Sequence, residues 1–168
     1  MYKIKLVKTF AKATLALYLL TLLWLVLFKF SYDVSGVLLE HQERSLNLVP
    51  FAGYSSGLRE MVDNFAVFVP FGLLLGVLFK QTSFWQKLGF IATFSIAVET
   101  IQYVLAIGMT DVTDVITNTL GGLVGLGLYN LGDKYIGSKW LDRVIVVIGL
   151  ILLVALILFR VLILKVRY

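Results

Sequence analysis

Five long apolar segments in a chain of 168 residues decide what this protein can fold into. They lie at residues 13–30, 64–79, 88–107, 115–132 and 144–164. A helix needs about 20 residues to cross the hydrocarbon core of a bilayer, and each segment approaches that length once its polar ends are included. Because lipid offers no partner to backbone N–H and C=O groups, such spans must be helical. We therefore predict an all-α fold, a polytopic membrane bundle of about five transmembrane helices in one domain over residues 1–168.

Composition supports a membrane environment and excludes several kinds of site. Hydrophobic residues make up 60% of the chain, against about 45–50% in soluble domains, and the mean hydropathy is +0.93. The chain has no cysteine and one histidine, His41, which excludes disulfides, thiol nucleophiles and multi-histidine zinc sites. The net charge of +5 comes from basic residues at the edges of apolar runs, which is typical of membrane orientation rather than nucleic-acid binding. We predict membrane lipids as partners, no nucleic acid and no cofactor.

The distribution of basic residues predicts the orientation of the chain. Lysine and arginine gather before the first apolar segment and in the connections 80–87 and 132–143, whereas the connections 31–63 and 108–114 hold few or none. The positive-inside rule then places the N-terminus in the cytoplasm of a multi-pass protein of the bacterial cell membrane. No small-x-small cleavage site follows the first apolar run, so we expect an uncleaved span. The side of the C-terminus stays open, because two basic residues near it fit an external position poorly.

The connection 31–63 is too long and too apolar for an ordinary loop. Apolar residues run from Leu46 to Phe51, just after Arg44 and Asn47. Connections of this length without structure of their own are uncommon unless they are functional. We predict an interfacial or re-entrant segment here, between the first two helices. Helical spacing before residue 64 also predicts an earlier start of the second helix, with Ser56 as a possible cap.

Four polar side chains interrupt the apolar segments at similar depth: Glu99, Gln102, Asn64 and Asn118. An ionisable group at membrane depth is expensive, and it is a functional hypothesis by default. One interpretation is a protonated Glu99 that holds helices together by hydrogen bonds. The other is a ligand-binding carboxylate in a wet cavity of the outer leaflet, which the common depth of the four residues favours. We expect them to face one another in one pocket.

Asp111 and Asp114 border the fourth apolar segment and have two open interpretations. As N-cap and first-turn residues they would satisfy free amides and suit the positive end of the helix dipole. Together with Glu99 they could instead bind a cation or the cationic part of a ligand, although no dedicated calcium-loop spacing is present and a metal remains unknown. Arg44 could reach lipid phosphates or pair with these aspartates. The candidate ligand-binding residues are Arg44, Asn47, Asn64, Glu99, Gln102, Asp111, Asp114 and Asn118, and no catalytic residue is assigned.

Glycines recur at spacings that allow helices to approach closely. Gly72 and Gly76 lie four residues apart in the second segment, as do Gly121 and Gly125 in the fourth, where Gly122 adds a third small residue. Small-xxx-small spacing is typical of tight helix pairs in membranes. We assign these five glycines to helix packing.

The order of three motifs resembles the VanZ-like family of small bacterial membrane proteins. The motifs are Arg44-Ser-Leu-Asn-Leu-Val-Pro-Phe51, Asn64-Phe-Ala-Val-Phe-Val-Pro-Phe-Gly72, and Glu99-Thr-Ile-Gln102 followed by the segment Asp111 to Gly122. The resemblance covers a core of about residues 44–125 and leaves the first and last helices as scaffold. It implies a function at the cell surface related to low-level resistance to teicoplanin.

Three functions compete at this point. The first is a non-enzymatic protein whose outer-leaflet pocket binds a lipid, a lipid-linked cell-wall precursor or a lipoglycopeptide, and so reduces susceptibility to teicoplanin. The second is an intramembrane enzyme that uses Glu99 or Asp114 as acid or base on a lipid-linked substrate, with Ser95 one helical turn away. The third is a transporter, which usually shows repeats or a continuous polar path. We rank them in that order and leave the oligomeric state open.

Overall fold

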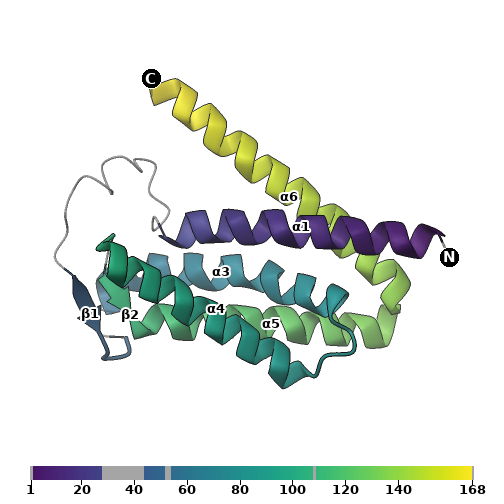
Figure 1. Ribbon diagram of the computed structural model, residues 1–168, viewed down its shortest axis with the longest axis horizontal. Helices are drawn as coiled ribbons and strands as arrows, with labels where there is room; N and C mark the ends of the chain where they lie inside the picture. Colours follow the sequence, from purple (N-terminus) through teal and green to yellow (C-terminus); the bar gives the residue numbers. More distant parts are fainter. Residues whose placement is uncertain (1, 28–43, 52–53, 108, 168) are drawn as a thin grey trace.

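The computed structural model describes residues 2–27, 44–51, 54–107 and 109–167, and these form a bundle of helices with one small strand pair (Figure 1). In chain order the elements are α1 (Tyr2–Leu27), β1 (Ser45–Asn47), α3 (Tyr54–Leu78), α4 (Phe84–Leu105), β2 (Met109–Asp111), α5 (Val112–Ile136) and α6 (Ser138–Arg167). The five helices of the described chain each contain one of the predicted apolar segments or nearly all of it. The predicted all-α class is confirmed.

The helices extend beyond the apolar segments from which they were predicted. The first helix begins at Tyr2, so that its basic N-terminal residues belong to the helix itself. The second begins at Tyr54, and Ser56 therefore lies inside its first turn rather than at its cap. Apolarity marks the part of a helix that contacts lipid or core, whereas the hydrogen-bonded backbone continues into its polar ends.

Three helices are long and apolar enough to cross a bilayer within the described residues: Thr9–Leu27, Gly57–Leu78 and Phe84–Leu105. Their outward faces remain apolar, as shown by Leu20 and Ile96, which are 65% and 53% exposed. Such faces suit contact with lipid better than contact with water. The protein is a membrane protein.

The closest contact in the bundle joins α3 to α5, and glycines make it possible. A Cβ added at Gly72, Gly121 or Gly125 would lie only 2.3, 2.2 or 2.1 Å from a backbone carbonyl oxygen of the other helix. A Cβ at Gly76 or Gly122 would instead overlap a tyrosine ring or an isoleucine side chain, at 2.3 and 2.7 Å. The two backbones are therefore in direct contact, and this fixes the height and rotation of α5 against α3.

Aromatic residues of α3 and α4 fill the centre of the bundle. Phe68 and Phe71 are fully buried, with ring centroids 5.9 Å apart in an edge-to-face arrangement. Phe94 of α4 packs its ring edge-to-face on Phe71, at 5.3 Å. Leu22 of α1 and Leu126 of α5 complete this core. Edge-to-face pairs add stabilisation beyond the buried area, which holds α4 onto the α3–α5 pair.

Strands β1 and β2 pair in parallel at one end of the bundle, and they were not predicted from the sequence. Ser45 lies opposite Met109, and Asn47 lies opposite Asp111. In the connection 31–63, where an interfacial or re-entrant segment was predicted, residues 31–43 and 52–53 lie outside the described ranges. Residues 44–51 form β1 and a following turn, and residues 54–63 belong to α3. The pair brings the connection after α1 against the connection between α4 and α5.

The two ends of the bundle differ in their connections. The start of α1, the turn between α3 and α4, and the turn between α5 and α6 lie at one end, and β1 and β2 lie at the other (Figure 1). At the strand end, α4 stops at Ala106, which has φ 53° and whose N–H returns to the carbonyls of Gln102 and Tyr103. This left-handed residue reverses the chain into β2.

Candidate functional site

A hydrogen-bonded network of three predicted residues lies where β1 and β2 meet α4. The Asn47 amide Nδ2 donates to Asp111 Oδ2 at 2.9 Å, and the Asp111 backbone N–H donates to Glu99 Oε2 at 3.1 Å. The Thr110 hydroxyl donates to the Glu99 backbone carbonyl at 3.2 Å. The strand pair therefore brings Asn47 and Asp111, which are 64 residues apart, to the carboxylate of Glu99.

Asp111 is also the N-cap of α5, as the capping interpretation expected. Its Oδ1 accepts from the Thr113 backbone N–H at 2.7 Å, so that its two carboxylate oxygens serve different partners. The Thr113 hydroxyl in turn accepts from the backbone N–H of Phe51, at 2.9 Å. Phe51 has φ 59°, a backbone conformation that is rare for a bulky residue. The turn after β1 is thus anchored to the first turn of α5.

Asp114 and Asn64 form a second, separate pair. Asn64 Nδ2 of α3 donates to Asp114 Oδ1 of α5 at 2.8 Å, and both residues are buried. A hydrogen bond between buried partners at this position continues the glycine contact of the same two helices toward the strand end. The first-turn acid therefore joins α5 to α3.

The buried amides Asn118 and Gln102 bind still other partners. Asn118 Nδ2 donates to the hydroxyl of Ser95 at 2.9 Å, and both residues are fully buried. Gln102 Nε2 donates to the carbonyl of Val26 at 2.9 Å and to that of Leu27, which are the last carbonyls of α1. Within the described chain, the side-chain oxygens of Asn118 and Gln102 accept no hydrogen bond. The four residues expected in one pocket are distributed over different contacts.

Arg44 lies beside this site and pairs with neither aspartate. Its Nη2 contacts the carbonyl of Val104, near the end of α4, at 3.5 Å, and the side chain is exposed. The ion pair that the sequence suggested with Asp111 or Asp114 is not formed. Arg44 therefore lies at the strand end, with its side chain exposed on the surface of the bundle.

A cavity of about 270 Å³ opens next to the network. Its walls come from β1, α4 and α5 and are mainly apolar, while Glu99 and Asp111 supply carboxylates. The complete lining is Leu46, Leu48, Ile96, Glu99, Thr100, Tyr103, Thr110, Asp111, Val112 and Val115. The described lining does not include Asn64, Gln102 or Asn118. An apolar cavity with two acids at one side suits an amphiphilic ligand better than a bare ion, and within the described residues no three acids or histidines are grouped to hold a metal.

Comparison with known proteins identifies the family. The family model described as VanZ/LLP1 matches residues 15–133. This chain belongs to the VanZ/LLP1 family. It is 52% identical over 153 residues to Protein VanZ of Enterococcus faecium, and the aligned residues are 91% of this chain and 94% of that protein. No solved structure matches the chain.

The three motifs of this VanZ/LLP1 member meet in space. The first motif provides β1, which pairs with residues 109–111, where the Asp111–Gly122 part of the third motif begins. The second motif lies on α3 and contacts the third through the Asn64–Asp114 pair and through Gly72, which lies against Gly122. The range matched by the family model exceeds residues 44–125 and includes the second half of α1. The family association with antibiotic resistance that the motifs implied is thereby supported.

Sequence reasoning named most of the network but missed its connecting residues. Thr110 and Thr113, and the backbone of Phe51, link the carboxylates to the strand pair. The available signal was that Thr113 lies two residues after the predicted cap Asp111, where its backbone N–H is expected to donate to the cap carboxylate. Its contact with Phe51 had no signal in the sequence.

Proposed function

We propose that this VanZ/LLP1 family protein binds a lipid or another cell-envelope component in the cavity beside Glu99 and Asp111. Binding there reduces susceptibility to lipoglycopeptides such as teicoplanin. The observation that carries the proposal is the cavity itself, with apolar walls and two carboxylates, built from the motifs of the family.

The cavity lining suggests how an amphiphile would lie in it. A hydrocarbon chain would contact Leu48, Ile96 and Val115, whose side chains form the apolar walls. A cationic or hydrogen-bonding head group would lie against Glu99 and Asp111, because hydrogen bonds to an ionised acceptor are about twice as strong as those between neutral groups. The ligand class is thus a lipid with an amine or hydroxyl in its head group.

The proposed placement in the membrane has five spans and a cytoplasmic N-terminus. The lysine-rich start of α1 and the two basic turns lie together at one end of the bundle, away from the strands (Figure 1). By the positive-inside rule that end is cytoplasmic, so the cavity opens in the outer leaflet. A cell-envelope ligand would enter from that side.

We favour binding over catalysis because of the surroundings of Ser95. This serine is fully buried, and its hydroxyl accepts a hydrogen bond from Asn118. The nucleophile that the enzyme hypothesis placed beside Glu99 is therefore engaged inside the bundle. Among the described residues that line the cavity, the hydroxyls of Thr100 and Thr110 donate to the backbone carbonyls of Ile96 and Glu99 and not to a carboxylate that could activate them.

The experiment measures the minimum inhibitory concentration of teicoplanin together with the membrane abundance of each variant in a susceptible host. The wild type should raise the inhibitory concentration. Glu99→Gln removes the charge and keeps an acceptor for the Asp111 N–H, and Thr100→Trp fills the cavity; both should abolish the effect at unchanged abundance. Thr93→Trp is the matched control, because Thr93 is exposed on the same helix two turns from Thr100 and does not line the cavity.

The outcome against the proposal is equally clear. If Glu99→Gln and Thr100→Trp both retain full protection, the cavity does not bind the relevant ligand. If the wild type gives no protection, the family function does not extend to this protein.

A further inference from the structure

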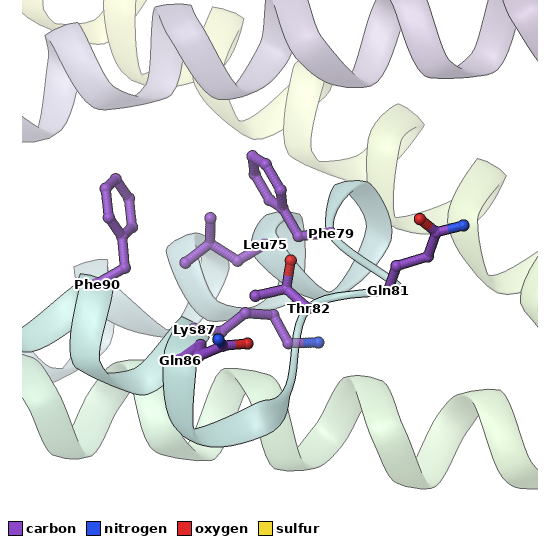
Figure 2. A pocket seen from close by; sticks show the side chains of 7 residues that line it. All are labelled: Leu75, Phe79, Gln81, Thr82, Gln86, Lys87 and Phe90. Carbon is purple, nitrogen blue, oxygen red and sulfur yellow. The ribbon is translucent and has the colours of Figure 1, made fainter.

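A second cavity lies at the opposite end of the bundle from the strand pair. It is formed by the end of α3, the turn that follows and the first turns of α4, and its volume is about 520 Å³. Its lining residues, shown in Figure 2, are Leu75, Phe79, Gln81, Thr82, Gln86, Lys87 and Phe90. None of them belongs to the candidate site. The volume falls in the range of about 300–1,000 Å³ that is typical of ligand pockets.

Lys87 is the charged residue in the lining of this cavity. It lies in the first turn of α4 and is only 7% exposed. Within the described chain its ammonium group forms no hydrogen bond and no ion pair. The neighbouring Lys80, by contrast, pairs with Asp142 at 2.6 Å. The stem of the side chain is buried, whereas Nζ is not among the fully buried polar atoms and so borders the cavity. A bound anion would pair with this ammonium and stabilise the folded protein.

The other polar groups around Lys87 favour an anion. The lining includes the hydroxyl of Thr82 and the amides of Gln81 and Gln86, and it includes no acid. Gln86 uses its Oε1 to accept the Ser83 N–H at 3.1 Å, which leaves its amide N–H groups available as donors. The cavity also borders the N-terminus of α4, the positive end of a 22-residue helix. The ammonium group, the hydrogen-bond donors and the positive end of the helix dipole all favour a negatively charged ligand.

The remaining lining is apolar and open at the rim. Phe79 and Phe90 are 46% and 51% exposed, and Leu75 between them is buried. In Figure 2 the two rings and the Leu75 side chain extend to the same side, while Lys87 runs beneath Thr82. A soluble anion such as phosphate would leave these rings unused. A lipid would place its acyl chain along them and its head group at the lysine.

We propose that this cavity binds the head group of an anionic phospholipid, with Lys87 as counter-ion of the phosphate and Phe79 and Phe90 against the acyl chain. Basic pockets at the membrane surface bind anionic head groups in this manner. In the proposed orientation the lipid comes from the cytoplasmic leaflet. This inference concerns a different end of the molecule and does not depend on the function of the outer cavity.

The test is native mass spectrometry of the purified full-length protein in detergent, titrated with phosphatidylglycerol, phosphatidylcholine or inorganic phosphate. Phosphatidylglycerol should bind the wild type at least about tenfold more tightly than phosphatidylcholine, as expected for a charge-assisted contact. Lys87→Gln should remove that preference. Lys139→Gln, an exposed lysine outside the cavity, is the matched control and should bind like the wild type.

A second pair of variants guards against misfolding of Lys87→Gln. Thr82→Asp places a carboxylate on the turn beside Lys87 and should weaken phosphatidylglycerol binding, whereas the neutral Thr82→Asn should not. Equal binding of the two lipids by the wild type, or unchanged binding by both Lys87→Gln and Thr82→Asp, would overturn the proposal. Binding of inorganic phosphate without lipid would replace the lipid with a soluble anion and refute the role of the aromatic residues.

Discussion

At the scale of single residues, the site depends on the side-chain amide of Asn47, whose orientation is determined by hydrogen bonds at both its nitrogen and its oxygen. Asn47 donates to Asp111 through Nδ2 and accepts the Val49 N–H through Oδ1 at 3.1 Å. Both ends of its side chain are therefore used, and a flip of the amide would break both bonds. Asp111 likewise divides its oxygens between Asn47 and the cap of α5. One asparagine thus fixes the strand, the cap and the carboxylate of the cavity.

Asn47→Ala should lower the free energy of unfolding by about 1–3 kcal/mol, because it removes a charge-assisted hydrogen bond and the acceptor of a turn. Ser45→Ala, on the same strand and exposed, is the control and should change stability little. Thermal unfolding of the purified protein in detergent measures both. Equal midpoints of the two variants would contradict the assigned role of Asn47.

At the scale of elements, the α3–α5 contact determines the geometry of the site. The glycine contact sets α5 against α3, and the Asn64–Asp114 bond continues it to the strand end. Because Asp111 begins α5, any movement of α5 along α3 would move the carboxylate relative to Glu99 on α4. The packing residues and the site residues are consequently linked through one rigid helix.

Gly125→Ala should destabilise the bundle by about 1–3 kcal/mol, since the new methyl group would lie 2.1 Å from the carbonyl oxygen of Val69 and must displace backbone. Gly127→Ala is the matched control two residues later, where no atom lies within 4 Å of the added Cβ. That control should be neutral or stabilising, because alanine favours a helix by about 1 kcal/mol over glycine. Denaturant unfolding with membrane abundance in cells would detect the difference, and equal behaviour would refute close packing.

At the scale of the whole molecule, the two ends of the bundle are chemically distinct. The strand end carries the acids Glu99 and Asp111 beside a small cavity. The other end carries basic turns and a larger cavity with Lys87. This polarity along the helix axes matches the charge asymmetry expected of a protein with a fixed orientation in a bilayer.

Single cysteines introduced into this cysteine-free chain test that orientation. Met109→Cys lies in β2 just before α5, and Tyr135→Cys lies in the last turn of α5. The helix has 25 residues and is about 37 Å long at 1.5 Å per residue. In intact cells an impermeant thiol reagent should label Met109→Cys and should label Tyr135→Cys only after the membrane is opened. The opposite pattern would show that the orientation in the membrane is the reverse of the proposed one. Labelling of both variants in intact cells would show that α5 does not span the membrane.

Local signals in the sequence predicted the helices, but they did not predict which side chains of different helices would contact one another. Apolar length and charge identify a helix within its own residues, which explains why five segments correspond to five described helices. Depth along a helix, however, says nothing of the direction around it. Asn64 and Asn118 share a depth with Glu99 yet face Asp114 and Ser95. The donation from Gln102 to α1 had a physical reason, because the last carbonyls of any helix need donors, but nothing in the sequence specified which helix.

The strand pair also escaped prediction for a physical reason. Strands of three residues are too short to show alternation, and their pairing depends on the whole chain between them. Parallel strands need a long crossover, and here α3 and α4 supply it.

The pairing of Asn47 with Asp111 sets an order of events during biosynthesis. The two residues are separated by 64 positions, so at about 5–20 residues per second the ribosome needs several seconds to deliver the second after the first. Until then β1 has no partner, and the first half of the protein must wait in the membrane with its loop unpaired. The cavity beside Glu99 is therefore completed late, after α4 has been made and α5 has begun. A chain truncated before residue 109 would contain all of α1, α3 and α4 and still lack the site.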